Sequence, residues 1–189
     1  MDRMTPHRCT NWFAVVGLDE DVAAFRSRMV PSGADAVVPH HDEPLAGALV
    51  DLVRSTANDG SGATRTDFSE IVTLHTDGDD GVSATSVRFV TPDAPPSAAV
   101  LAVAKRFRNL SFVHAHATPE QDDGGALYHR NGRVESDDVI DPEIMDPYAY
   151  DVAVEEAWRT KAEGLFGDML ERAIADVSWD PAPARSSQP

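Results

Sequence analysis

Apolar and polar residues alternate most clearly in the middle of the chain, where a strand, a helix and a second strand are predicted in succession. Residues 87–91 and 110–116 are short, largely apolar runs of the kind that form strands. Between them, Val100, Val103 and Phe107 recur at helical spacing behind a proline pair, and proline is well tolerated where a helix begins. This order predicts a βαβ unit whose strands are direct neighbours or straddle a third.

The same patterns predict strands and helices on both sides of this unit. Residues 11–17 are largely apolar on both faces, which is typical of a central strand. Asp19 is suited to begin a helix that continues to about residue 29. The other expected elements are a helix at 44–57, strands at 68–75 and 83–91, and a long helix at 150–177.

Asn131 and Gly132 predict a hairpin between strands at 125–130 and 133–136, because a type I′ turn needs positive φ at both central residues. We expect this hairpin to extend or flank the sheet. The acidic, proline-containing residues 137–147 are expected to form a linker.

The expected C-terminal helix carries an apolar stripe that needs a partner. Trp158, Leu165 and Met169 lie on this stripe at helical spacing. We expect the stripe to cover the sheet face that the other helices leave open, or to pack on the helix at 44–57. A helix that did neither would be an oligomerisation element, which would make the protein a homo-oligomer.

Length and composition are those of a globular protein. The chain has 189 residues, 42% of them hydrophobic, which is enough for one self-sufficient core. No apolar run approaches the roughly 20 residues of a membrane-spanning helix, and the first ten residues lack the apolar stretch of a secretion signal. The single cysteine, Cys9, excludes an intramolecular disulfide. We therefore expect a cytoplasmic protein with no membrane contact.

The charge balance is strongly acidic, at −16, and Asp supplies 22 of the 32 acidic residues. These residues are dispersed, and only two lysines accompany them, which favours adaptation to high salt, where the self-repulsion of such a surface is screened. The alternative is a functional acidic surface that mimics DNA or binds a basic protein. Direct binding of nucleic acid is not expected, because it depends on Lys and Arg to neutralise phosphates.

Several short motifs point to a known family. They are Pro6, Cys9 and Asn11 before the first strand, Phe89 and Thr91 before the pair Pro95 and Pro96, the run KRFRNLSF at 105–112, and Gly125 followed by Asn131 and Gly132. On these residues, positions 6–136 resemble the YubB-like ferredoxin-like domain family, here in an acidic, halophile-type version. The sequence departs from the family pattern at three positions, which hold His7, Asp93 and Arg108.

The resemblance implies an α+β protein with a ferredoxin-like βαββαβ antiparallel sheet. The expected organisation is a ferredoxin-like domain over residues 1–147, with an insertion at about 32–66 that contains the inserted helix. The C-terminal helix follows at 148–178, and a disordered tail at 179–189. Members of the family are mostly uncharacterised and often belong to plasmids, phages and genomic islands, so the resemblance implies no known reaction.

His114 and His116 are the most suggestive pair of side chains. Residues i and i+2 of a strand point to the same face, so both imidazoles could ligate one metal ion, and His129 could join them if its strand pairs alongside. The alternative is that the pair shares its face with Leu110 and Phe112 and is hydrogen-bonded packing. The residues favour this second interpretation, so the sequence predicts no metal and no other cofactor.

Three residues are candidates for a binding surface. Arg130 and Arg133 are expected to face each other across the hairpin tip and to form a small basic spot on an acidic protein. Trp179 lies in the predicted tail, where an aromatic side chain could dock on a partner. Cys9 has no recognisable catalytic partner in the sequence and is expected to be a small buried residue rather than a nucleophile.

No sequence signature of catalysis accompanies these residues. The nucleophile elbow, the phosphate-binding loop, the dinucleotide fingerprint and the zinc-protease motif are all missing from the sequence. We therefore expect a non-enzymatic binding or accessory protein of a plasmid, virus or genomic island in a salt-adapted host, acting through an unidentified protein partner. The two alternatives are an acidic decoy that mimics DNA, and a metal-binding protein that uses the three histidines.

Overall fold

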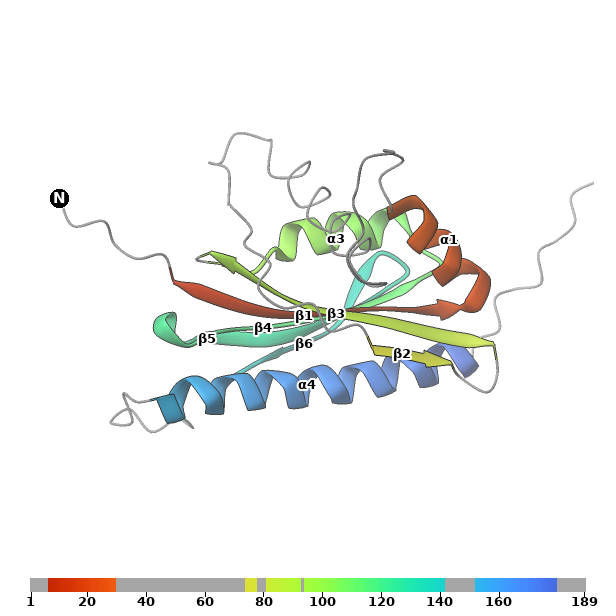
Figure 1. The fold of residues 1–189 in the computed structure, drawn as a ribbon. Coiled ribbons are helices and arrows are strands. Elements are labelled where there is room, and N and C mark those ends of the chain that lie inside the picture. The colour runs from red at the N-terminus through yellow and green to blue at the C-terminus, as the bar shows by residue number, and fades with distance from the viewer. Residues whose placement is uncertain (1–6, 30–73, 78–80, 93, 142–151, 180–189) are drawn as a thin grey trace, which may run out of the picture.

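The computed structural model describes residues 7–29, 74–77, 81–92, 94–141 and 152–179. Within these ranges the protein is an α+β structure built on one six-stranded antiparallel sheet. The elements in chain order are β1 (Arg8–Leu18), α1 (Asp19–Met29), β2 (Leu74–Asp77), β3 (Val82–Pro92), α3 (Ser97–Arg106), β4 (Ser111–Thr118), the 3₁₀ helix η1 (Pro119–Gln121), β5 (Asp123–Arg130), β6 (Arg133–Val139) and α4 (Val152–Trp179). Figure 1 shows α1 and α3 on one face of the sheet and α4 on the other.

The strands lie in the order β2-β3-β1-β4-β5-β6, with every pairing antiparallel. The prediction that residues 11–17 form a central strand is confirmed, because β1 pairs with β3 on one side and β4 on the other. At its centre, Phe13 lies between Val87 of β3 and His114 of β4. The strands predicted to flank α3 therefore straddle β1 and are not direct neighbours.

One long helix, α4, packs across β1, β3, β4 and β5 on one face of the sheet. Its inward side buries Trp158, Phe166 and Met169 against small and apolar side chains of the sheet. Gly124 is required at this contact, because a Cβ there would lie 2.9 Å from Cζ3 of Trp158. The expectation that the C-terminal helix covers the open face is confirmed, so its apolar stripe is used within the chain.

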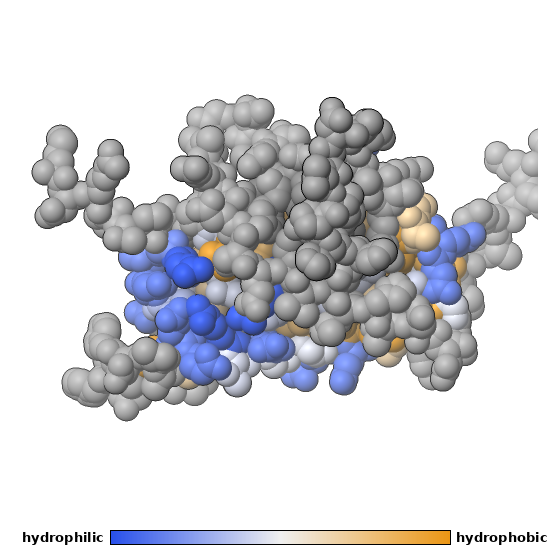
Figure 2. Space-filling view, viewed as in Figure 1, coloured by the Kyte–Doolittle hydropathy of each residue, from blue (hydrophilic) through white to orange (hydrophobic). Residues whose placement is uncertain are grey.

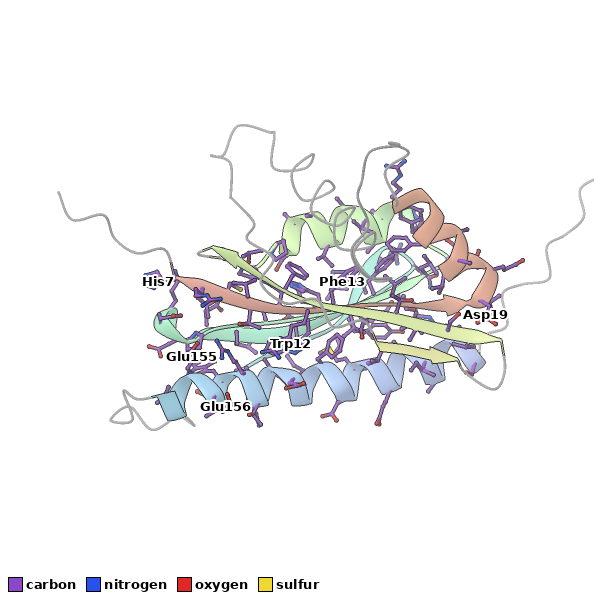
Figure 3. The ribbon with its side chains drawn as sticks, in the orientation of Figure 1. His7, Trp12, Phe13, Asp19, Glu155 and Glu156 are labelled. Atoms are coloured by element: carbon purple, nitrogen blue, oxygen red, sulfur yellow. The ribbon has the colours of Figure 1, made fainter. Side chains whose placement is uncertain are left out.

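The opposite face holds a cluster of aromatic rings under α1 and α3. Phe25 of α1 meets Phe107, just after α3, edge-on, with 5.0 Å between ring centroids, and it also meets Phe112 of β4 at 5.8 Å. Figure 3 shows how the alternation of β1 serves both faces, with Phe13 directed towards α3 and Trp12 towards α4. The two faces therefore have separate cores.

The predicted hairpin is confirmed as β5 and β6. Asn131 and Gly132 have φ of 53° and 74°, the positive values that a type I′ turn requires. A bulge between Tyr128 and His129 shifts the pairing register by one residue. The prediction of a linker from residue 137 is wrong for its first three residues, because β6 continues through Val139.

Several predictions fall outside the described residues. They concern the inserted helix at 44–57, the insertion at 32–66, most of the strand predicted at 68–75, and all but the first residue of the tail predicted at 179–189. The end of that predicted strand is seen, as β2, which pairs with β3 at the sheet edge. The prediction of a disordered tail is wrong for its first residue, because Trp179 is the last residue of α4. None of the helices in the described ranges is both long and apolar enough to cross a membrane.

Candidate functional site

A group of polar side chains lies on the α1/α3 face of the sheet, near the end where β1 starts. The register of β1, β3 and β4 brings Cys9 opposite Thr91, and Asn11 opposite His116, with His114 one step further along the same face. Cys9, Asn11 and His114 are completely buried. These side chains combine a thiol, an amide, a hydroxyl and imidazoles, so they are the part of the described structure where catalytic chemistry has to be considered.

Asn11 is the centre of a hydrogen-bond network. Its Nδ2 donates to the backbone carbonyl of Cys9 and to Oγ1 of Thr91, both at 3.0 Å. Its Oδ1 lies 3.1 Å from Nε2 of His114, and an amide oxygen can only accept, so this imidazole nitrogen carries the proton. Thr91 in turn donates to the carbonyl of Ala94 at 2.7 Å. The network therefore ties β1 to β3 and to β4.

Burial keeps the titratable members of this network neutral. Desolvation raises the pKa of the Cys9 thiol, which is therefore protonated at neutral pH. Desolvation, followed by the neighbouring charges of His116 and His129, lowers the pKa of His114 to about 3. The Sγ of Cys9 lies 3.7 Å from Asn11 Oδ1, and the imidazole of His114 donates to that same oxygen. A thiolate–imidazolium pair, which a cysteine nucleophile needs, is therefore not formed here.

The three histidines lie on one face of the sheet, as the strand alternation predicts. The rings of His114 and His116 are stacked, with centroids 6.0 Å apart, and His129 lies opposite Phe112 in the register of β4 and β5. Nε2 of His116 is 3.4 Å from Oδ2 of Asp123, whereas neither ring nitrogen of His129 has a hydrogen-bond partner among the described residues.

Burial also lowers the pKa values of His116 and His129, although nearby Asp137 opposes this effect at both rings. In the described ranges, no group of three or more His, Cys, Asp or Glu side chains is placed to hold a metal ion. The geometry therefore gives the metal-binding hypothesis for His114, His116 and His129 no support.

The predicted basic spot lies at the hairpin tip, and its two arginines have different surroundings. Arg130 and Arg133 face each other in the strand register, as expected. Arg130 reaches α4, where its Nη2 donates to the backbone carbonyl of Asp176 at 3.3 Å and its Nη1 lies 3.9 Å from Oδ2 of the same residue. Arg133 is exposed. Trp179 is the last residue of α4, and the structure describes only its backbone.

The exposed strand β6 extends beyond the strand that the sequence predicted at 133–136. It forms one edge of the sheet, and all of its residues except Ser136 are exposed. It carries the two exposed large apolar residues of the described ranges, Val134 and Val139, at 48% and 75%. Its last three residues, Asp137, Asp138 and Val139, belong to the segment that the acidic sequence predicts as a linker, so the sequence does not predict the full length of this edge.

Two other surfaces are less distinctive. An open groove on the outer side of α4 is lined by residues of that helix alone, and they include no buried polar group. Figure 2 shows hydrophilic residues gathered at the end of the molecule where β1 starts.

Comparison with known proteins identifies no relative. No family model matches the chain, and neither the curated proteins nor the solved structures contain a match. Function therefore has to be argued from the residues and their geometry.

Proposed function

We propose that this protein is a non-enzymatic binding or accessory protein that acts through contacts with another protein. We assign it to the YubB-like ferredoxin-like domain family and to a mobile element of a salt-adapted host. The family assignment is supported by Cys9, Asn11 and Thr91, because three residues of the resembling motifs meet in one hydrogen-bond network. The fold assignment is supported by the neighbour order β2-β3-β1-β4, which a βαββαβ ferredoxin-like unit produces.

The observation that carries the proposal is the closed state of the buried network. Its thiol is protonated, its imidazole is neutral and bound to an amide oxygen, and Cys9 and His114 have no exposed surface. A substrate would have to displace Asn11 from three partners to reach either group. The network is therefore suited to hold three strands together. Binding of a partner would then take place on the outer surface of the protein.

An acidic decoy that mimics DNA is the second candidate. It is motivated by the net charge of −16 and by the exposed carboxylates of Glu135, Asp137 and Asp138 on a single strand. The two candidates differ in what competes with the partner. A protein that recognises a DNA mimic is displaced by duplex DNA, whereas a partner held by contacts specific to this surface is not.

Affinity capture tests the proposal, with the full chain as bait in an extract of the source cells at high salt. The matched bait is Cys9→Ser, which removes the thiol and keeps a small side chain. We expect both baits to retain the same partner protein, and duplex DNA to leave it bound. The proposal fails if no partner is retained, if only the wild-type bait forms a covalent adduct, or if DNA displaces the partner.

A further inference from the structure

The geometry points to β6 as a docking strand, and we propose that it adds an extended, basic segment of a partner protein to the edge of the sheet. This inference rests on the proposed function, because it names the surface and the kind of partner. Strand addition of this type uses the unpaired backbone groups of a sheet edge for affinity and alternate side chains for specificity.

Within the described residues, the backbone of β6 has no strand partner along one side. β6 is the last strand in the sheet order, and β5 is the one described strand with which it pairs. β6 contacts α3, and next to it at the hairpin tip Gly132 lies against Lys105. Exposed edges are usually shortened, covered or protected by charge, because they pair readily with other strands. β6 is seven residues long and carries two exposed valines, so charge is its main protection.

The side chains of β6 define what an added strand would meet. Val134, Asp137 and Val139 lie opposite His129, Leu127 and Gly125, which places them on the α1/α3 face. The pKa values of His116 and His129 also respond to Asp137, consistent with this placement. Ser136 and Asp138 face the α4 side. One face thus presents an acidic residue between two exposed apolar ones, and the other presents a second carboxylate.

The carboxylates of β6 favour a basic segment of another protein over a second copy of this chain. A second copy paired antiparallel about Ser136 would place Glu135 opposite Asp137 twice, and like charges directly opposite each other are destabilising. No ion pair joins the carboxylates of β6 to a cation in the described ranges. An extended segment with Lys or Arg between apolar residues would satisfy the carboxylates and cover the valines.

Binding of a synthetic peptide tests the proposal. The probe is a fluorescent peptide in which valine, lysine and valine occupy successive alternate positions, so that they share one face, and lysines occupy the positions between them. Its anisotropy is followed with the full chain at moderate salt. The variant Asp137→Lys/Asp138→Lys changes the edge, and Glu163→Lys/Glu171→Lys makes the same change in charge at exposed residues of α4. We expect the β6 variant to lose affinity at least about tenfold and the α4 variant less than about twofold.

A second peptide separates strand addition from general attraction to an acidic protein. N-methylation of alternate backbone amides keeps the charges but removes the donors that would pair with β6. We expect this peptide not to bind, and the unmodified peptide to slow hydrogen exchange at the amides of β6. Equal losses in the two variants, or equal binding of the two peptides, would overturn the proposal. A dimer of the free chain that the β6 variant abolishes would overturn the choice of occupant.

The peptide experiment and the capture experiment test different claims. A captured partner that the Asp137→Lys/Asp138→Lys bait retains in full would refute docking at β6 while the proposed function stands. A peptide that binds β6 while no cellular protein is captured would leave the edge a strand-binding surface and refute the proposed function.

Discussion

The two faces of the sheet are both buried by helices, but the side chains beneath the helices differ. The α4 face is covered by one helix, and its core is made of apolar side chains centred on Trp158. The α1/α3 face has an aromatic cluster at one end and the buried network of Asn11 and His114 at the other. The first face gains stability mainly from buried apolar area, whereas the second also depends on the hydrogen bonds of Asn11 to Thr91 and His114.

The largest effect that the comparison predicts is on the α4 face. Trp158→Ala should lower the free energy of unfolding by about 3–5 kcal/mol, because Trp158 is completely buried and its removal leaves a large cavity. Gly164→Ala is the matched change on the outer side of the same helix, where a Cβ meets nothing within 4 Å. It should stabilise the protein by up to about 1 kcal/mol, since alanine is the better helix former. Denaturant unfolding measures both, and a small loss for Trp158→Ala would mean that α4 does not hold this face.

The next effect is a pH dependence that belongs to the α1/α3 face alone. The pKa of His114 is about 3 in the folded chain and near 6.5 when unfolded, so the unfolded chain binds more protons between these values. Stability is therefore full above pH 6.5 and falls by about 1.4 kcal/mol per pH unit below it, until pH approaches 3. Carboxylates contribute in the same range, so the measured quantity is the difference between the wild type and His114→Gln. That difference should shrink steadily with falling pH, and a constant difference would show that His114 is not buried as a neutral ring.

The network itself is tested by Asn11→Ala. This change leaves His114 Nε2 and Thr91 Oγ1 without a bond to the amide in a buried site, at a cost of about 1–3 kcal/mol. Asn11→Asp keeps the shape and the acceptor oxygen but replaces the donor and buries a charge, so it should be at least as harmful. Chemical unfolding at neutral pH measures both. A loss of unfolding free energy below about 0.5 kcal/mol for Asn11→Ala would show that the network contributes no more to stability than an ordinary surface contact.

The smallest effect is expected at the sheet edge. Val139→Thr should change stability by no more than about 0.5 kcal/mol, because three quarters of Val139 is exposed. The same substitution at Val113, which is completely buried against α4, should cost about 1–3 kcal/mol. Thermal unfolding of the two variants gives the contrast. A large loss at Val139 would show that this residue is part of the core and not available to a partner.

The sequence was informative wherever structure is local. The apolar faces of residues 11–17 predicted a central strand, Asn131 and Gly132 predicted the turn, and strand alternation placed the histidines on one face. The buried network could not be predicted, because Asn11 is 80 residues from Thr91 and 103 from His114, and periodicity does not register such pairs.

The end of β6 was missed for a different reason. Its alternation is interrupted by the bulge beside His129 and by consecutive acidic residues, so the pattern after residue 136 is typical of a linker. Only the pairing of Asp137, Asp138 and Val139 with β5 makes this segment a strand. An exposed edge strand has no apolar face to reveal it in the sequence.

Alkylation of Cys9 in the native protein tests most directly the central claim that the buried network is structural and closed. The rate of modification by iodoacetamide is measured over a denaturant series and compared with that of an unfolded peptide of residues 6–12. We predict that the native thiol reacts only through global unfolding, with a denaturant dependence equal to that of equilibrium unfolding, because Cys9 has no exposed surface and its pKa is raised. Rapid alkylation that does not depend on denaturant would show an accessible, ionised thiol and would contradict the claim.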